Sequence, residues 1–452
     1  MQRLPVLLDP YRADTFPYLP ELAEGCKVSY KEWLKVFKKS TPTFTEHCLT
    51  AEHKDGTPEI GARQFTDDFN MILDALDKDP HAEVPGYDVQ PFSCDQLCVA
   101  REQCLIRAGF KDIFLSVKRE EDEAAMPILP IVLKELDSES DPKKRLILAA
   151  QGVFAGNIFD LGAAASAEHY QKRKMARKQA YEGGRNATNN NTNSENSIIT
   201  DSQIDGSAPL CVANNSDADL TASIMNENPT KSDFAHTRDK LHPRPWLIDD
   251  LDLFLERLLV VQSDQSTARY DKAVLFVDNA GPDVLLGMMP FARELLKLNI
   301  EVVIAANELP SINDITASEL KHLLPDIFAA EEMKTSDENI NPSDDEENRP
   351  KGIFRKAAES GRFRVVSSGN GLPVIDLSRV SPELSAEVDP KAINPDRLLI
   401  VLEGMGRSIE TNLRARFACD ALNMGMVKHP EVALELEGKM YDCVCRFRLA
   451  GQ

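Results

Sequence analysis

The chain has 452 residues, of which 42% are hydrophobic and 28% charged, a composition typical of a globular protein with two or three domains. Its formal net charge of −21 disfavours binding to nucleic acid or to anionic membranes, since both need clustered Lys and Arg. No apolar run is long enough to span a bilayer, and the first residues lack the features of a signal peptide. We therefore expect a cytoplasmic protein with reduced cysteines and with no nucleic-acid or membrane partner.

The first part of the chain is predicted to be mainly helical. Apolar residues recur at helical spacing over 65–76, 94–106 and 128–136, and the stretch 145–167 is rich in Ala, Leu and Gly that would pack closely. Strand-like alternation is scarce in this part. These patterns predict a helical N-terminal domain over residues 1–182.

Two polar segments interrupt the chain. Residues 183–240 include an Asn/Thr/Ser tract with few apolar side chains, which cannot bury enough surface to offset the entropy cost of ordering. We predict a disordered, Asn-rich insertion there. The acidic stretch 331–350 is predicted to be an expanded surface loop.

From residue 241 onward, strands and helices alternate. Helices are predicted at 247–261, 283–298, 312–324 and after Arg407, and strands at 273–278, 301–307, 363–367, 398–403, 421–427 and 442–447. This alternation predicts an α/β domain over residues 241–452, with a parallel or mixed sheet covered on both faces.

Oxygen-bearing side chains follow the first of these strands. Asp278 and Asn279 end the buried run 273–278, and Gly281 and Asp283 lead into the next helix. The carboxyl ends of strands are where open α/β sheets bind ligands. Helix N-termini attract phosphate and side-chain oxygens attract hard cations, so this turn suggests phosphoryl chemistry.

The next strand, 301–307, repeats this arrangement and is followed by Asp314. Adjacent parallel strands would bring Asp314 beside Asp278 and Asn279, which gives three oxygen ligands suited to Mg²⁺, Mn²⁺ or another divalent ion. Two plainer interpretations stay open. Ser311 and Asp314 fit a helix capping box, and Asp278 with Asn279 fits an ordinary turn.

Glycine-containing segments supply two further candidates. Strand 398–403 ends in a turn in which Gly404 and Gly406 would let the backbone approach a ligand, and Arg407 could grip a phosphate with two nitrogens. An ordinary tight turn with a solvated arginine is the alternative. In the helical part, Asn157 lies in an apolar run with glycines and Asp160, and these residues either face the same site or end a helix.

Motifs for several other chemistries are absent. The chain has no Gly-x-x-x-x-Gly-Lys-Ser/Thr loop, which disfavours a P-loop kinase or ATPase. A haloacid-dehalogenase-type phosphatase needs Asp-x-Asp at the strand end, and Ala280 takes the second Asp position. Cys94, Cys98 and Cys104 have no paired histidine nearby, so buried structural thiols are expected there.

Taken together, these motifs resemble the metal-dependent damage-control phosphatases. The run Glu403-Gly-Met-Gly-Arg407 marks the subfamily of 4′-phosphopantetheine phosphatases. The resemblance implies a helical N-terminal domain against an αβα sandwich with a Rossmann-like, mostly parallel sheet. The segments that carry it are 101–102, 109–112, 156–160, 244–250, 277–283, 312–314 and 403–407.

The resemblance also implies roles for single residues. A divalent ion, either Mn²⁺, Ni²⁺, Co²⁺ or Mg²⁺, would act as cofactor, and Asp283 or Asp314 would orient the attacking water. The implied metal ligands are Asp278, Asn279 and Asp314; the implied catalytic residues are Asp278, Asp283 and Asp314; the implied substrate and phosphate contacts are Asp283, Arg407, Gly404, Gly406 and Asn157.

The function expected from this resemblance is hydrolysis of a small-molecule phosphomonoester. The implied substrate is 4′-phosphopantetheine or its oxidised or damaged forms, whose removal would keep damaged intermediates out of coenzyme A synthesis. Two alternatives stay open at this point: a phosphatase for other phosphometabolites such as sugar phosphates, and a non-catalytic regulatory protein that binds metal and phosphoester.

Overall fold

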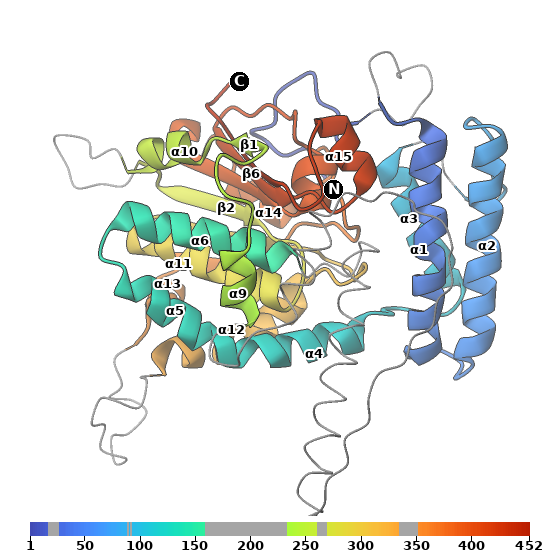
Figure 1. Cartoon of the computed structure of the whole chain (residues 1–452), viewed down its shortest axis with the longest axis horizontal. Helices are drawn as coiled ribbons and strands as arrows, with labels where there is room; N and C mark the ends of the chain where they lie inside the picture. Colours follow the sequence, from blue (N-terminus) through green and yellow to red (C-terminus); the bar gives the residue numbers. More distant parts are fainter. Residues whose placement is uncertain (17–26, 88–89, 91–92, 159–232, 260–268, 334–350) are drawn as a thin grey trace, which may run out of the picture.

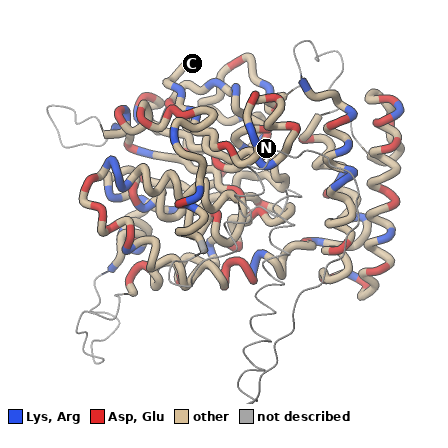
Figure 2. The backbone as a smooth tube through the Cα atoms, viewed as in Figure 1, with Lys and Arg blue, Asp and Glu red and all other residues tan. Residues whose placement is uncertain are grey.

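The computed structural model of the chain describes all residues except 17–26, 88–89, 91–92, 159–232, 260–268 and 334–350 (Figure 1). Most of the predicted Asn-rich insertion, most of the predicted acidic loop and Asp160 therefore lie outside the described residues. None of the described helices is long and apolar enough to cross a membrane. Acidic and basic residues are interspersed along the backbone, including the long helices of the N-terminal part (Figure 2).

Three helices near the N-terminus lie beside the sheet as a separate layer (Figure 1). They are α1 (Tyr30–Thr50), α2 (Pro58–Lys78) and α3 (Cys94–Arg107). Their buried faces share one apolar cluster, which includes Trp33 and Phe65 and extends to residues of the α/β part such as Ile409. The helical periods seen in the sequence here correspond to real helices.

A second group of helices covers one face of the sheet. It comprises α4 (Leu115–Ala125), the short 3₁₀ helix η2 (Met126–Ile128), α5 (Leu129–Ser138), α6 (Pro142–Asn157) and α9 (Asp233–Asp239). Although α5 and α6 precede residue 182, their apolar faces pack in one cluster with the sheet. α9 lies inside the range 183–240 and is helical, with Phe234 buried in that same cluster. The proposed division at residues 182 and 240 stays a prediction.

A seven-stranded sheet forms the centre of the molecule, in the order β1-β7-β6-β5-β2-β3-β4. Neighbouring strands are parallel except β6 and β7, which confirms the predicted α/β class with a mostly parallel sheet. The chain leaves β2 for β3 on one side and returns to β5 on the other, so a topological switch point lies at β2. The strands are β1 (Ile248–Asp249), β2 (Lys272–Phe276), β3 (Glu301–Ala306), β4 (Phe363–Ser367), β5 (Leu398–Glu403), β6 (Asp420–Met426) and β7 (Cys443–Arg448).

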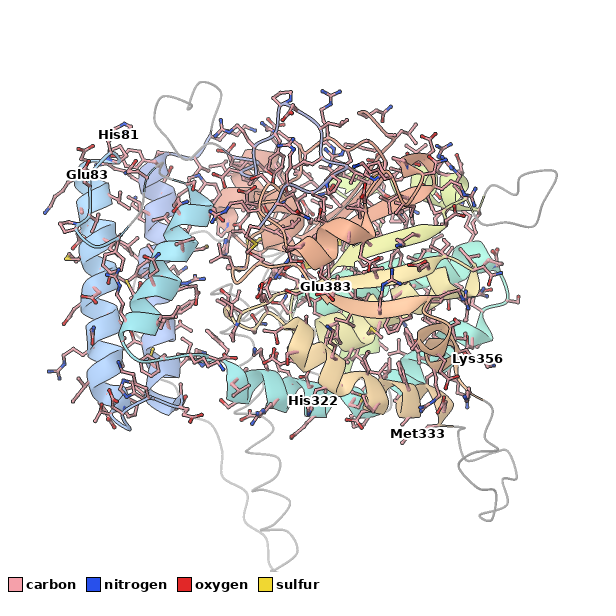
Figure 3. All side chains as sticks on the ribbon, turned by 180° about the vertical axis from the view of Figure 1, so that it is seen from behind. His81, Glu83, His322, Met333, Lys356 and Glu383 are labelled. Atoms are coloured by element: carbon pink, nitrogen blue, oxygen red, sulfur yellow. The ribbon has the colours of Figure 1, made fainter. Side chains whose placement is uncertain are left out.

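The two faces of the sheet are buried by different elements, because successive strand residues point to opposite sides. Ala273 and Leu275 of β2 join the cluster of α6 and α11, while Val274 and Phe276 pack with the N-terminal segment and α14. Figure 3 shows the molecule from behind, with Glu383 of α14 labelled; its carboxylate accepts a hydrogen bond of 3.1 Å from the Ser367 N–H that ends β4. The remaining helical elements are α10 (Leu251–Leu258), the π-helix η3 (Asp283–Met288), α11 (Met289–Lys297), α12 (Ala317–Glu332), α13 (Ile353–Glu359), α14 (Pro382–Glu387), the 3₁₀ helix η5 (Pro395–Arg397), the π-helix η6 (Met405–Glu410) and α15 (Pro430–Leu436).

Three predicted element boundaries are wrong. The helix expected from residue 312 begins at Ala317, because Thr316 and Glu319 form its capping box; the candidate box of Ser311 and Asp314 is not used. The helix expected from 247 begins only after the short strand β1. The segment expected to be a helix after Arg407 is the π-helix η6, which ends at Glu410.

Candidate active site

The candidate site lies where β2, β3 and β5 end side by side. β2 is paired with β3 on one side and with β5 on the other, and all three run in the same direction. Their carboxyl ends therefore place Asp278, Asp314 and Glu403 at one edge of the sheet. The Asp278 backbone N–H donates to Glu403 Oε2 at 3.0 Å, and Asn279 and Asp314 form an isolated antiparallel bridge. The predicted convergence of two strand ends is thus present, and a third strand end joins it.

Three carboxylates form a compact buried cluster at this edge. One oxygen from each of Asp278, Asp283 and Glu403 lies within 4.8 Å of the others. Asp278 is 3% exposed, Asp283 1% and Glu403 0%. Because like charges at this distance repel and burial removes the water that would solvate them, such a group needs protons or a cation. Glu403 was not assigned to this group from the sequence. Its position at the end of a predicted strand, like that of Asp278, was the available signal.

Asn279 links two of these carboxylates and leaves oxygens available. Its Nδ2 donates to Asp283 Oδ2 at 2.7 Å and to Asp278 Oδ2 at 3.1 Å. Among the described residues, Asn279 Oδ1 and Asp283 Oδ1 are buried without a hydrogen-bond partner. Burial raises the pKa of Asp283, although the charge of Lys428 and the bonds from Asn279 and Asn157 oppose that rise. Orphaned oxygens in a carboxylate cluster are the donor set that a hard divalent cation prefers.

Asn157, at the C-terminal end of α6, ties the cluster together. Its Nδ2 donates to Glu403 Oε1 at 2.8 Å and to Asp283 Oδ2 at 3.2 Å, and its Oδ1 accepts from the Met426 N–H at 3.2 Å. The residue is fully buried. Asn157 therefore faces the site, which was one of the two interpretations of its position in the sequence. It also lies at the last residue of α6, so the other interpretation holds as well.

Arg407 is buried between two of the predicted metal ligands. It is 2% exposed, and its Nη2 donates to Asp314 Oδ2 at 2.6 Å and to Asn307 Oδ1 at 3.0 Å. Its Nη1 forms an ion pair with Asp278. The solvated-arginine alternative is therefore wrong, because the guanidinium is enclosed by carboxylates rather than by water.

The two glycines before Arg407 make close contacts that explain their presence. Gly404 has a φ of +97° and a side chain there would collide with the Asp278 carboxylate. A side chain at Gly406 would collide with the Pro373 carbonyl. In this structure Gly404 faces the site, whereas Gly406 packs against the segment before Val374.

Lys428 is a second buried cation that the sequence did not single out. It follows the end of β6, which pairs with β5, and is 1% exposed. Its Nζ donates to the Asn157 carbonyl at 2.8 Å. A systematic search of every strand end for charged residues would have found it.

The charges of the described site residues do not balance. Four carboxylates meet two cations, which leaves two negative charges if all groups are ionised. A divalent cation would neutralise this excess without protonating any group. The residues counted are Asp278, Asp283, Asp314 and Glu403 against Arg407 and Lys428.

The loop before Asp314 shows a strained backbone and an unsatisfied amide. Ile312 has a φ of +42°, which is unusual for a β-branched residue. Asn313 is 0% exposed, and within the described structure neither its Nδ2 nor its Oδ1 has a hydrogen-bond partner. Strain and unsatisfied polar groups of this kind concentrate at functional sites.

Known proteins share both the sequence and the fold. Residues 36–198 and 185–444 match the family model described as the damage-control phosphatase ARMT1-like domain. The chain is 37% identical over 443 residues to a damage-control phosphatase of Arabidopsis thaliana, across 97% of this chain and 93% of that protein.

Two more distant relatives match nearly the whole chain but less than half of their own lengths. Pantothenate kinase 2 of Arabidopsis thaliana is 33% identical across 99% of this chain and 42% of its own length. The 4′-phosphopantetheine phosphatase of Mus musculus is 23% identical across 99% of this chain and 48% of its own length. A crystal structure of a DUF89 family protein from Pyrococcus horikoshii has a TM-score of 0.50 and 17% identity, over 94% of this chain and 99% of that one, which indicates a shared fold.

Proposed function

This chain belongs to the damage-control phosphatases of the ARMT1-like domain family, and from that premise we propose that it hydrolyses 4′-phosphopantetheine or an oxidised or damaged form of it. The phosphatase prediction is confirmed by the family, which is metal-dependent. The observation that carries the substrate proposal is the match to the mouse 4′-phosphopantetheine phosphatase over 99% of this chain. The cytoplasmic location and the coenzyme A context belong to the same proposal.

We propose Asp278, Asn279 and Asp314 as the ligands of the divalent cofactor. Asp278 and Asp314 already share one cationic group, the guanidinium of Arg407, so their carboxylates are able to share a metal ion. Asn279 has an orphaned Oδ1 beside them. When bound, the metal would polarise the phosphoryl group and lower the pKa of a bound water.

The cluster of Asp278, Asp283 and Glu403 is the competing ligand set. Both oxygens of Glu403 accept hydrogen bonds, from the Asp278 N–H and from Asn157, whereas Asp283 accepts the bonds from Asn279 and Asn157 through Oδ2 alone. This favours a supporting role for Glu403, which would fix the Asp278 backbone, while Asp283 would orient Asn279 through Oδ2 and contact the substrate through Oδ1.

The two buried cations are suited to the phosphoryl group. Once a metal neutralises Asp278 and Asp314, the guanidinium of Arg407 can grip two phosphoryl oxygens, and Lys428 offers a second positive charge near Asp283. Preorganised cations in a site without water stabilise the charge that develops on a transferred phosphoryl group. Asn157 would keep Asp283 and Glu403 in position while this happens.

The test is phosphate release from a panel of phosphomonoesters by metal-free protein and by protein supplied with Mn²⁺, Co²⁺, Ni²⁺ or Mg²⁺. We expect activity only with metal, and the highest kcat/KM for 4′-phosphopantetheine or its disulfide or sulfonate. A preference for sugar phosphates would overturn the substrate proposal.

Two isosteric variants separate the two ligand sets. Asp314→Asn should weaken Mn²⁺ binding strongly and Glu403→Gln much less, because glutamine keeps an oxygen that accepts the Asp278 N–H. The opposite order would assign the metal to Asp278, Asp283 and Glu403.

A further inference from the structure

Helices α3 and α4 make polar contacts with both loops that carry the site. We call residues 277–282 the β2 loop and residues 307–316 the β3 loop. The sequence places these helices 150 residues or more before either loop, and neither helix contributes a residue to the carboxylate cluster. The loop residues that these helices contact are nevertheless only a few positions from Asn279, Asp283 or Asp314 in the sequence.

The most direct contact holds the β2 loop. The Gly281 N–H donates to Asp122 Oδ1 of α4 at 2.8 Å. Gly281 lies midway between Asn279 and Asp283, so this bond helps to fix the turn that sets both side chains, together with the backbone bond from the Ala280 N–H to the Asn313 carbonyl. Gly281 has a φ of +71°, and a Cβ there would lie 2.6 Å from the Cβ of Glu121, which shows how closely α4 packs on the loop.

A second contact reaches the C-terminal end of the β3 loop. Lys118 of α4 is 2% exposed and its Nζ lies 2.7 Å from Glu319 Oε1 and 2.9 Å from Asp112 Oδ2. The other oxygen of Glu319 accepts from the Thr316 N–H at 2.8 Å, in the cap of α12. Lys118 thereby stabilises the cap that immediately follows Asp314 and Ile315.

A third contact reaches the middle of the β3 loop. Ser311 Oγ donates to Glu102 Oε1 of α3 at 3.1 Å. Glu102 in turn is paired with Arg101, whose guanidinium lies over the Phe44 ring. Ser311 precedes the strained Ile312, so the contact acts where the backbone needs external support.

We propose that α3 and α4 form a positioning element for the metal ligands, with Asp122 as its principal positioning residue. This inference rests on the proposed metal site. Asp122 acts through the Gly281 backbone and touches neither substrate nor metal. Residues of this kind matter because a site is productive only when its ligands are held within about 0.5 Å of the working geometry.

The chemistry of the contact predicts which substitutions are tolerated. Asp122→Asn keeps a side-chain oxygen that accepts the Gly281 N–H, whereas Asp122→Ala leaves that N–H without its acceptor and the loop less firmly held. Loss of a partner that orients metal ligands typically weakens metal binding by about 10–100-fold. We expect a loss of about tenfold for alanine and a change within about twofold for asparagine.

The experiment titrates Mn²⁺ into metal-free protein by calorimetry and measures kcat and KM separately. Asp389→Ala is the matched control, because it removes a similar bond, from the Lys391 N–H at 3.0 Å, in the loop before β5 at the opposite edge of the sheet. We expect weaker Mn²⁺ binding and a lower kcat for Asp122→Ala, with KM nearly unchanged, and wild-type values for the control.

Equal Mn²⁺ affinity in Asp122→Ala and wild type would overturn the inference, and so would equal losses in the alanine and asparagine variants. Ser311→Ala tests the same element independently if the first variant does not fold: we expect about threefold weaker binding, and wild-type affinity would again overturn it. If wild-type protein itself binds no Mn²⁺, the proposed metal site fails rather than the positioning role.

Discussion

Replacing Arg407 with lysine should destabilise the metal-free protein far more than the metal-loaded protein. In the structure the guanidinium serves two carboxylates at once, with Nη2 at 2.6 Å from Asp314 Oδ2 and Nη1 paired with Asp278, and it also donates to Asn307 at 3.0 Å. A lysine ammonium has neither the fork nor the reach to serve both acids.

The magnitude follows from the contacts that lysine cannot replace. One charge-assisted hydrogen bond contributes about 1.5–3 kcal/mol and one neutral bond contributes about 1 kcal/mol. We therefore expect a loss of about 3 kcal/mol in the unfolding free energy of the metal-free protein, close to the lower end for breaking a buried ion pair, about 3–5 kcal/mol.

Metal should remove much of this difference. A divalent cation bound by Asp278 and Asp314 neutralises the carboxylates that Arg407 neutralises in its absence. The cation stabilises any folded protein that binds it, by about 2.7 kcal/mol at a hundred times its Kd. Because Arg407 no longer competes for these acids, we expect the lysine variant to bind metal at least as tightly as wild type, although its kcat/KM for the phosphoester falls.

The assay is denaturant unfolding in EDTA and in excess Mn²⁺. Arg293→Lys is the control, since Arg293 is also buried, at 6% exposed against 2% for Arg407, and is paired at 2.8 Å with Asp137, outside the site. Its cost should be the same with and without metal. A cost below about 0.5 kcal/mol for Arg407→Lys in EDTA, the range of ordinary surface substitutions, would refute the reasoning. The same cost in both conditions would show that Arg407 and the metal do not share ligands.

Four further expectations follow from individual contacts. Asp278→Ala should abolish phosphate release while circular dichroism still reports a folded protein; wild-type turnover would remove Asp278 from the mechanism. Gly404→Ala should weaken Mn²⁺ binding in a calorimetric titration, because its methyl group would displace the Asp278 carboxylate; unchanged affinity would contradict this. Burial raises the pKa of Asp14 from 3.8 to about 7, so wild type loses stability as the pH rises from 4 to 7 and this carboxyl ionises. In denaturant titrations Asp14→Asn should therefore equal wild type near pH 4 and be more stable at pH 8, by up to about 4 kcal/mol. Removing residues 186–230, which precede α9, should leave turnover and melting temperature nearly unchanged, and loss of soluble expression would refute the predicted disordered insertion.

The sequence was most informative where a strand and its first following residues form one local unit. The run ending in Asp278 and Asn279 predicted both a buried strand and its polar end, and the same rule placed Asp314 beside them. Such units can be predicted because the spacing of apolar residues and the residue preferences of turns are local properties of the sequence. The capping box of Thr316 and Glu319 could have been predicted in the same way, but the similar pattern at Ser311 and Asp314 was considered instead.

Contacts between distant segments could not be predicted in this way. Nothing around Arg407 indicates that its guanidinium lies between two acids that are 129 and 93 positions earlier. The bond from Gly281 to Asp122 spans 159 positions and depends on how α4 packs on the β2 loop. Lys428 and Glu403 can be recognised in the sequence as charged residues at strand ends. Only the spatial order of the strands, β6-β5-β2, shows that they lie near Asp278.

The two π-helices also decide where the chain near the site tolerates a change of length. η6 begins just after β5 ends at Glu403, η3 begins at Asp283 itself, and each contains the extra residue that distinguishes a π-turn from an α-turn. Deleting one residue from 284–288 would remove this extra residue and leave an ordinary α-helix, so Asp283 and α11 would keep their directions relative to each other. Residues 280–282, which connect Asn279 to Asp283, lie outside the π-helix, and a deletion there would move Asp283 relative to Asn279. A protein engineer should therefore treat 280–282 as fixed in length and place a one-residue deletion within 284–288.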